Sequence, residues 1–248
     1  MKQKKLKIAF VFTLLVSILV FTSCSPNLHI KLSDSGDVSY TFNATISPMM
    51  EEMARSFSGS ESDVPLFNRI QIQDSLESAG FEDVTVKVPD NSSVSILGFI
   101  LEKESLEKKD DSDLLPLIPS SLVLNGGGKT PGELKVSLSS EVLTKIVELI
   151  PPETAEYIDL LSAPVFTGDE MSAVEYAELI AAIYGETAVK ELEKGIVQVT
   201  VEVPYKINSS FVSIDTASVS YKDKIAVFNI PLIDILAPSE KIFFCIQF

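Results

Sequence analysis

The glycine-rich segment from Asn125 to Thr130 ends in Gly-Lys-Thr, which is the ending of a phosphate-binding loop. Such a loop also needs a glycine five positions before its Gly-Lys pair, and Val123 occupies that position. A helix must follow directly, so that backbone N–H groups point at the phosphate. Here Pro131 and Gly132 follow, and then a segment of strand type. We therefore predict a hairpin turn at this position and no nucleotide site.

The single histidine, His29, is the next candidate for chemistry. One imidazole without a second histidine or a group of thiols cannot form an ordinary zinc site. A Ser-His-Asp triad would have to use His29, but the chain has no Gly-x-Ser-x-Gly nucleophile elbow. We therefore assign His29 a structural role and predict neither a metal nor a cofactor.

Paired carboxylates could serve glycoside hydrolysis or bind calcium. Neighbouring acidic residues occur at Glu51/Glu52, Asp110/Asp111, Glu153/Glu156 and Asp169/Glu170. None of these pairs has the ligand spacing of a calcium loop. With 35 acidic residues in 248, such pairs are expected by chance, so we interpret them as solvated surface. The sequence thus favours a protein that is not an enzyme, with a carboxylate-based hydrolase as the alternative.

The first 23 residues have the organisation of a secretory signal peptide. A basic start is followed by a largely apolar run of 14 residues, from Ile8 to Phe21, and then by small residues before Cys24. A membrane-spanning helix needs about 18 or more apolar residues, so this run is too short to be one. We predict that residues 1–23 are removed and that the mature chain is exported.

The stretch from Phe21 to Cys24 resembles the lipobox of bacterial lipoproteins. Phe21 stands where leucine is usual, and looser boxes of this kind are typical of spirochaete lipoproteins. The resemblance implies that Cys24 carries palmitate-type acyl chains and becomes the mature N-terminus. Cys245, the other cysteine, would then have no disulfide partner. The alternative is an ordinary signal peptide, with a Cys24–Cys245 disulfide possible in the mature protein.

The charge of the chain limits its partners. Its formal net charge is −15, and loss of the four leader lysines takes the mature chain to −19. Such a surface repels phosphate backbones, which argues against nucleic acid as a partner. It also repels anionic lipid head groups, so attachment to a membrane would come from the acyl chains.

Hydrophobic patterning predicts an α+β fold with largely antiparallel sheets. We expect strands at 27–32, 37–46, 84–88, 94–101, 122–125, 133–138, 196–203, 213–221, 225–230 and 241–248. We expect helices at about 48–57, 65–80, 140–150, 153–161, 172–184 and 186–194, and a short turn at 231–236. Two of the helices carry terminal signals: a Ser172–Glu175 capping box opens one, and Gly195 ends another.

An internal similarity suggests a duplication. Residues 76–89 are similar to 192–204 with one residue deleted, and an Asn-Ser-Ser turn follows each copy. We therefore expect two β-β-α-β-β units: 24–101, and 121–248 with a helical insert at 140–194, joined by a connector at 102–120. Chance similarity between two Val-Thr-Val strands is the competing explanation.

The opening of the first unit, two strands around Asp34 to Asp37 directly after Cys24, resembles the LppM-type domain of bacterial lipoproteins. The resemblance covers about residues 25–101 and lies in strand order and turn chemistry. It implies a role in the cell envelope without established catalysis.

The helical insert is the candidate binding region. Core packing is the default explanation for its residues Phe166, Tyr176, Ile180 and Tyr184. The functional alternative is that they line a groove for an apolar ligand or a partner peptide. The sequence therefore predicts a lipid-anchored envelope protein that binds a partner protein or an apolar ligand. It would lie on the periplasmic face of the inner or outer membrane, or on the cell surface. A passive structural protein or surface antigen is the third possibility.

Overall fold

The computed structural model describes ten stretches of the chain. They are residues 26–34, 37–49, 51–52, 55, 63–78, 81–100, 121–123, 132–138, 163–164 and 171–248. Several predictions fall outside them: the leader at 1–23, lipidation at Cys24, the connector at 102–120, the turn at 125–130, the helices at 140–150 and 153–161, and Phe166.

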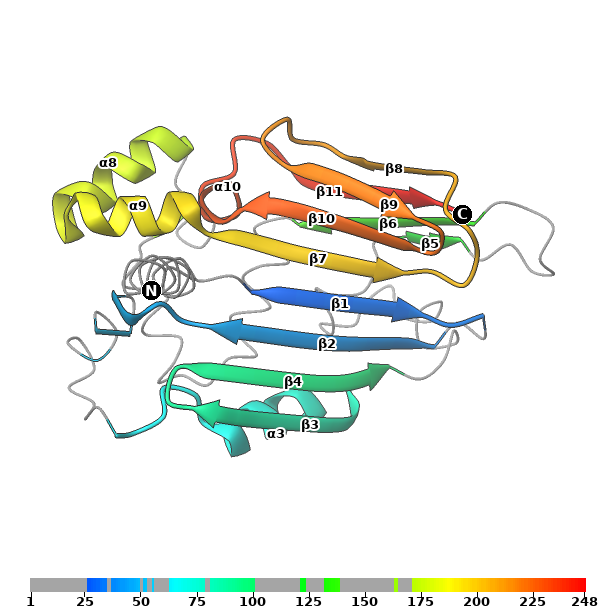
Figure 1. The fold of residues 1–248 in the computed structure, drawn as a ribbon, viewed down its shortest axis with the longest axis horizontal. Coiled ribbons are helices and arrows are strands. Elements are labelled where there is room, and N and C mark those ends of the chain that lie inside the picture. The colour runs from blue at the N-terminus through cyan, green and yellow to red at the C-terminus, as the bar shows by residue number, and fades with distance from the viewer. Residues whose placement is uncertain are drawn as a thin grey trace, which may run out of the picture.

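The described residues form an α+β fold with mostly antiparallel strands, which confirms the predicted fold class (Figure 1). The strands are β1 (Asn27–Leu32), β2 (Val38–Thr45), β3 (Glu82–Asp90), β4 (Ser93–Ile100), β5 (Ser121–Val123), β6 (Glu133–Leu138), β7 (Ile196–Glu202), β8 (Ser209–Val212), β9 (Ser218–Lys222), β10 (Ile225–Pro231) and β11 (Ile242–Gln247). The helices are α3 (Arg69–Ser78), α8 (Ala173–Tyr184), α9 (Glu186–Lys194) and α10 (Leu232–Leu236). Residues 48–49, 51–52 and 55 are also helical, where the first helix is predicted.

Seven strands form the larger sheet, in the order β3-β4-β2-β1-β7-β10-β9. At its centre β1 and β7 run parallel, with Ile30 opposite Val201, while the other described strand pairs are antiparallel. This parallel pair joins a strand of the first expected unit to a strand of the second. The two units therefore share one sheet.

One face of this sheet is buried, and buried side chains alternate with more exposed ones along strands such as β2, β3 and β10. A second sheet, in the order β5-β6-β11-β8, packs on this face beside β7 and β10. The rings of Phe228 on β10 and Phe244 on β11 lie 4.6 Å apart between the two sheets. Both side chains are almost fully buried, so this contact lies at the centre of the main core.

The helix α3 covers the other half of the same sheet face. Its Ile72 is buried with Phe81, whose ring lies edge-on to Tyr40 at a centroid distance of 5.7 Å. Gly98, opposite Tyr40 on β4, leaves room for this ring, because a Cβ at Gly98 would come within 3.1 Å of it. Figure 1 shows α3 behind β3 and β4.

The helices α8, α9 and α10 form a smaller core of their own at one end of the sheets. The predicted capping box is confirmed: the backbone N–H of Glu175 donates to Ser172 Oγ, and Ser172 donates to the Glu175 carboxylate. Gly195 ends α9, as predicted, and its N–H bonds to carbonyls of the last turn. A Cβ at Gly195 would lie 2.9 Å from Leu232, so the close packing of α9 on α10 requires glycine here.

The predicted duplication is wrong. In the first half, both hairpins lie in one sheet, in the order β3-β4-β2-β1. In the second half, the hairpin β5–β6 lies in the smaller sheet, whereas β7 lies in the larger one. The two similar segments therefore hold different positions in the fold.

Two local predictions in the C-terminal part also need correction. Of the strand expected at 213–221, only the second part is a strand, β9 in the larger sheet, and the strand that precedes it, β8 in the smaller sheet, was not predicted. Residues 213–217 between them carry the chain across from one sheet to the other. The turn expected at 231–236 is the helix α10, which closes the small helical core with Leu236.

Candidate functional site

The structure describes three of the four residues predicted to line a groove. Tyr176 and Ile180 are 0% and 3% exposed, and they pack against α9 and α10 in the small helical core. These two side chains therefore have the core packing that was the default explanation, and they are closed to a ligand groove. Burial raises the pKa of the Tyr176 hydroxyl, and to a smaller degree that of Tyr184, which is half-buried. Phe166 lies outside the described residues, so ligand contact at this position stays a prediction.

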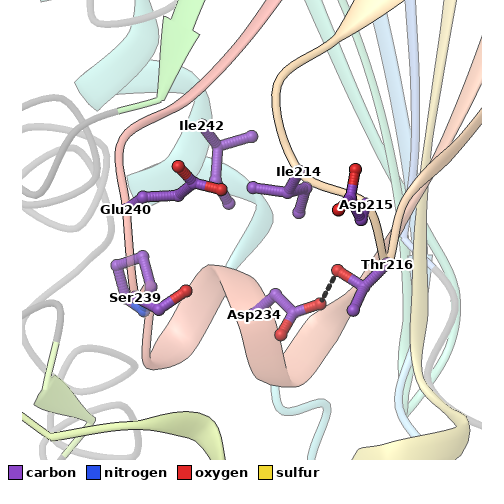
Figure 2. Close-up of a pocket in the computed structure, with 8 residues that line it drawn as sticks. Ile214, Asp215, Thr216, Asp234, Ser239, Glu240 and Ile242 are labelled. Atoms are coloured by element: carbon purple, nitrogen blue, oxygen red, sulfur yellow. Dashed lines mark hydrogen bonds between the residues drawn. The ribbon is translucent and has the colours of Figure 1, made fainter.

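A hollow of about 200 Å³ lies beside α10, between the chain at 214–216 and the approach to β11. Figure 2 shows the carboxylates of Asp215, Asp234 and Glu240 around it. The hydroxyl of Thr216 donates to Asp234 Oδ2 at 2.6 Å, which ties α10 to the segment between β8 and β9.

This hollow does not support the hydrolase alternative. Its three carboxylates stand on different sides, and the hydrogen bond drawn there joins Asp234 to a hydroxyl and not to a second carboxyl group (Figure 2). Paired acid and base catalysis needs two carboxyl groups that face the same bond. Within the described stretches, no group of three His, Cys, Asp or Glu side chains could hold a metal ion.

A row of amide side chains crosses the open face of the seven-stranded sheet, on the side away from the core. The amide of Asn27 donates to Gln198 Oε1 at 2.7 Å, and the amide of Gln198 donates to Asn229 Oδ1 at 3.2 Å. Ser218 continues the row, with its Oγ 3.5 Å from the Asn229 amide nitrogen. These four residues come from β1, β7, β10 and β9, which the sheet register places side by side. We call them the amide row.

A second row of polar side chains runs beside the amide row. Lys31 Nζ lies 2.9 Å from one carboxylate oxygen of Glu202, and His29 Nε2 lies 3.8 Å from the other. His29 Nε2 is buried and makes no hydrogen bond, although 40% of the side chain is exposed. His29 therefore belongs to a cross-strand contact, which agrees with the structural role predicted for it.

The open face is nearly neutral in an acidic molecule. The register places the cations Lys31, Lys87 and Lys222 and the anions Glu82 and Glu202 on this side of the sheet. No described helix or strand covers it, because α3 and the smaller sheet both pack on the opposite face (Figure 1).

Sequence reasoning did not single out this face. The residues of this face alternate with core residues, as Asn27, His29 and Lys31 do on β1. The sequence of each strand therefore has the pattern of any half-buried strand. Asn27 and Gln198 are 171 positions apart, and only the β1–β7 pairing brings their amides together.

Comparisons with known proteins give little further information. No protein-family model matches the chain, and no curated protein matches it. Among solved structures, the chain is similar to the NMR structure of the folded domain of the Mycobacterium tuberculosis LppM protein. The match has a TM-score of 0.37 and 14% sequence identity, and covers 91% of this chain and 88% of that one. A likeness at this level carries no argument about function.

The described helices give no candidate for a membrane span. None of them is both long enough and apolar enough to cross a bilayer.

Proposed function

We propose that this chain is a non-enzymatic lipoprotein of the bacterial cell envelope. Acyl chains on Cys24 hold it to a membrane, and the open face of the seven-stranded sheet binds a partner protein. The chain sequence supports the anchor through its basic start, its apolar run and its lipobox-like Phe21 to Cys24. The body would lie on the periplasmic face of either membrane or on the cell surface.

The observation that carries the binding role is the amide row. Each side-chain amide offers two N–H donors and a carbonyl acceptor, and the contacts along the row use only part of this capacity. The lateral hydrogen bonds hold the amides in place before any partner arrives, which lowers the entropy cost of binding. A protein surface, which carries its own hydrogen-bond donors and acceptors, can pair with the free donors and acceptors of the amide row.

The charge of the face favours the same kind of partner. A body of net charge −19 repels most acidic envelope components, but its open face holds both signs in nearly equal number. A partner can approach this side without that repulsion. An apolar ligand fits less well, because Tyr176 and Ile180 are closed inside a core and the amide row on the open face is polar.

The anchor is tested with two cysteine variants. Cys24→Ser should abolish metabolic incorporation of an acyl label and leave unprocessed precursor, because the thiol that accepts the lipid is gone. Cys245→Ser, which removes the other cysteine, should label as the wild type does. Wild-type protein that takes up no acyl label and is released in soluble form would contradict the anchor.

The binding face is tested by site-specific photo-crosslinking from Thr200, which lies between the amide row and the Glu202 pair. Gln198→Arg should remove the crosslinked product, because it places a long cation in the middle of the row. Gln247→Arg is the matched control: Gln247 is exposed on β11 in the other sheet, and this variant should keep the product.

A further variant guards against loss of folding. Asn43→Arg changes an exposed residue opposite Asn27 and leaves the three contacts of the amide row intact. It should also reduce the product while the melting temperature stays within a few degrees of wild type. A product that survives both face variants would contradict the binding site. A wild-type chain that gives no product from Thr200 would favour the passive structural or antigen role.

A further inference from the structure

The tether between the proposed lipid and the folded body is very short. Only Ser25 and Pro26 lie between Cys24 and the first residue of β1, and extended residues span at most about 3.5 Å each. Pro26 is already attached to the sheet, because its carbonyl accepts a hydrogen bond of 2.9 Å from the Gln198 N–H. The start of β1 must therefore lie close to the surface of the membrane that holds the lipid.

The sheet register shows which parts of the fold lie at that end. The strands β1 and β7 begin there, and β2, β3 and β10 end there. Hydrogen bonds attach the neighbouring segments: Ile46 N–H to the Ser92 carbonyl at 3.0 Å, and Leu66 N–H to the Asn91 carbonyl at 2.9 Å. Leu232 N–H bonds to the Gly195 carbonyl at 2.8 Å, which places α9 and α10 at the same end. We call this part the anchor end, and it is the left side of Figure 1. It comprises residues 46–49, 64–70, 91–92, 173–195 and 231–236.

Exposed aliphatic side chains gather at the anchor end. Val64 and Ile70, at the start of α3, are 48% and 63% exposed, and Val174 and Ile183 on α8 are 68% and 54% exposed. The other large apolar side chains with high exposure lie elsewhere: Leu97 on the open face, Phe211 and Phe243 on the smaller sheet, and Tyr205, Tyr221 and Ile225 at the opposite end.

We infer that the anchor end rests on the bilayer that holds the Cys24 lipid, with Val64, Ile70 and Ile183 in its interfacial region. The inference rests on the proposed lipidation of Cys24. Apolar side chains gain free energy by leaving water for the interface, and the short tether removes the entropy cost of bringing them there. The glutamates on α8 and α9, which are Glu175, Glu178, Glu186, Glu191 and Glu193, outnumber the lysines of α9, Lys190 and Lys194, so the contact should be weaker with anionic than with zwitterionic lipids.

This orientation has a consequence for the open face. The strands β1 and β7 start at the membrane and lead away from it. The open face with its amide row is therefore turned to the side of the body, and it is not pressed against the bilayer. A partner can then reach the open face from the side.

The test uses the lipidated protein in phosphatidylcholine vesicles, in a Cys245→Ser background so that introduced cysteines are the free thiols. A fluorophore is attached at Ile183→Cys, at Val64→Cys, or at Lys222→Cys as the control. Lys222 is exposed and pairs with Ile225, six residues along β10 from Pro231, or about 20 Å from the anchor end. Lipids carrying a nitroxide on the head group quench fluorophores that lie near the membrane surface.

Quenching at positions 183 and 64 should exceed that at position 222 by at least threefold. Addition of phosphatidylglycerol should reduce this difference, because the acidic helices are repelled. Equal quenching at all three positions, in protein that floats with the vesicles, would overturn the orientation and leave the anchor intact. Protein that does not float with the vesicles would overturn the anchor and the orientation together.

Discussion

At the scale of single residues, the clearest stabilising interaction is the N-cap at the start of α8. Ser172 and Glu175 satisfy backbone N–H groups that the first helical turn leaves without intrahelical partners. The hydrogen bond from the Ser172 backbone, and then the one from its hydroxyl, lower the pKa of Glu175 from its ordinary value of 4.5. The cap matters for the fold because α8 supplies Tyr176 and Ile180 to the small helical core.

Ser172→Ala should lower the free energy of unfolding by about 1 kcal/mol at pH 7. Because the pKa of Glu175 is lower in the folded chain, its carboxylate stabilises above the unfolded pKa and loses this effect as the pH falls through the folded pKa. The variant keeps the bond from the backbone N–H and loses the one from the hydroxyl, so the difference between variant and wild type should shrink by that smaller part below about pH 4.5. Urea unfolding at several pH values measures it, with the exposed Ser220→Ala as control. A difference that grows at low pH would contradict this role.

At the scale of elements, β11 joins the two layers of the fold. Its side chains alternate, so Ile242, Phe244 and Ile246 enter the main core, while Phe243 and Gln247 point outward. Adjacent phenylalanines on one strand thus have opposite environments: Phe244 is 1% exposed and Phe243 is 40% exposed. Phe243 contacts Phe211 on β8 at a centroid distance of 5.9 Å, on the outer side of the smaller sheet.

Phe244→Ala should destabilise the fold by about 3–5 kcal/mol, because it leaves a cavity between the two sheets next to Phe228. Phe243→Ala is the matched control and should cost about 1 kcal/mol, mainly from the lost contact with Phe211. Guanidinium unfolding of both variants gives the comparison. Equal losses would mean that the smaller sheet does not pack through the inner face of β11.

At the scale of the whole molecule, the parallel pairing of β1 with β7 joins the two halves of the chain into one folded unit. The sheet runs without a break across the two expected units, and one hydrophobic core includes Ile30, Val201, Phe228 and Phe244. The chain should therefore unfold as one body, even though a charged and proline-rich connector separates its two halves in sequence.

Residues 26–248 should show a single calorimetric transition, with equal van't Hoff and calorimetric enthalpies. Residues 121–248 alone should not melt cooperatively, because β7 loses its partner β1 and the apolar side chains on that strand face water. Near-UV circular dichroism and calorimetry of the two chains measure this. A sharp transition in the fragment would show that the second half folds independently.

Local sequence signals predicted the elements whose stability is local. The capping box of α8, the glycine after α9 and the alternation along β1, β2 and β7 each act within a few residues, so they can be read directly. Between 213 and 221 the same reading failed. Residues 213–217 form the connection from β8 in the smaller sheet to β9 in the larger one, and this crossing depends on the packing of the two layers.

The sequence by itself determined the class of the fold and the face that each strand buries, because these depend on composition and on period-two patterning. The tertiary structure alone decided which strands are neighbours. The alternation of β1 and β7 is compatible with many partners, and the choice depends on how apolar faces far apart in sequence are buried together. For that reason the amide row, made by residues up to 202 positions apart from Asn27 to Asn229, exists only in the folded chain.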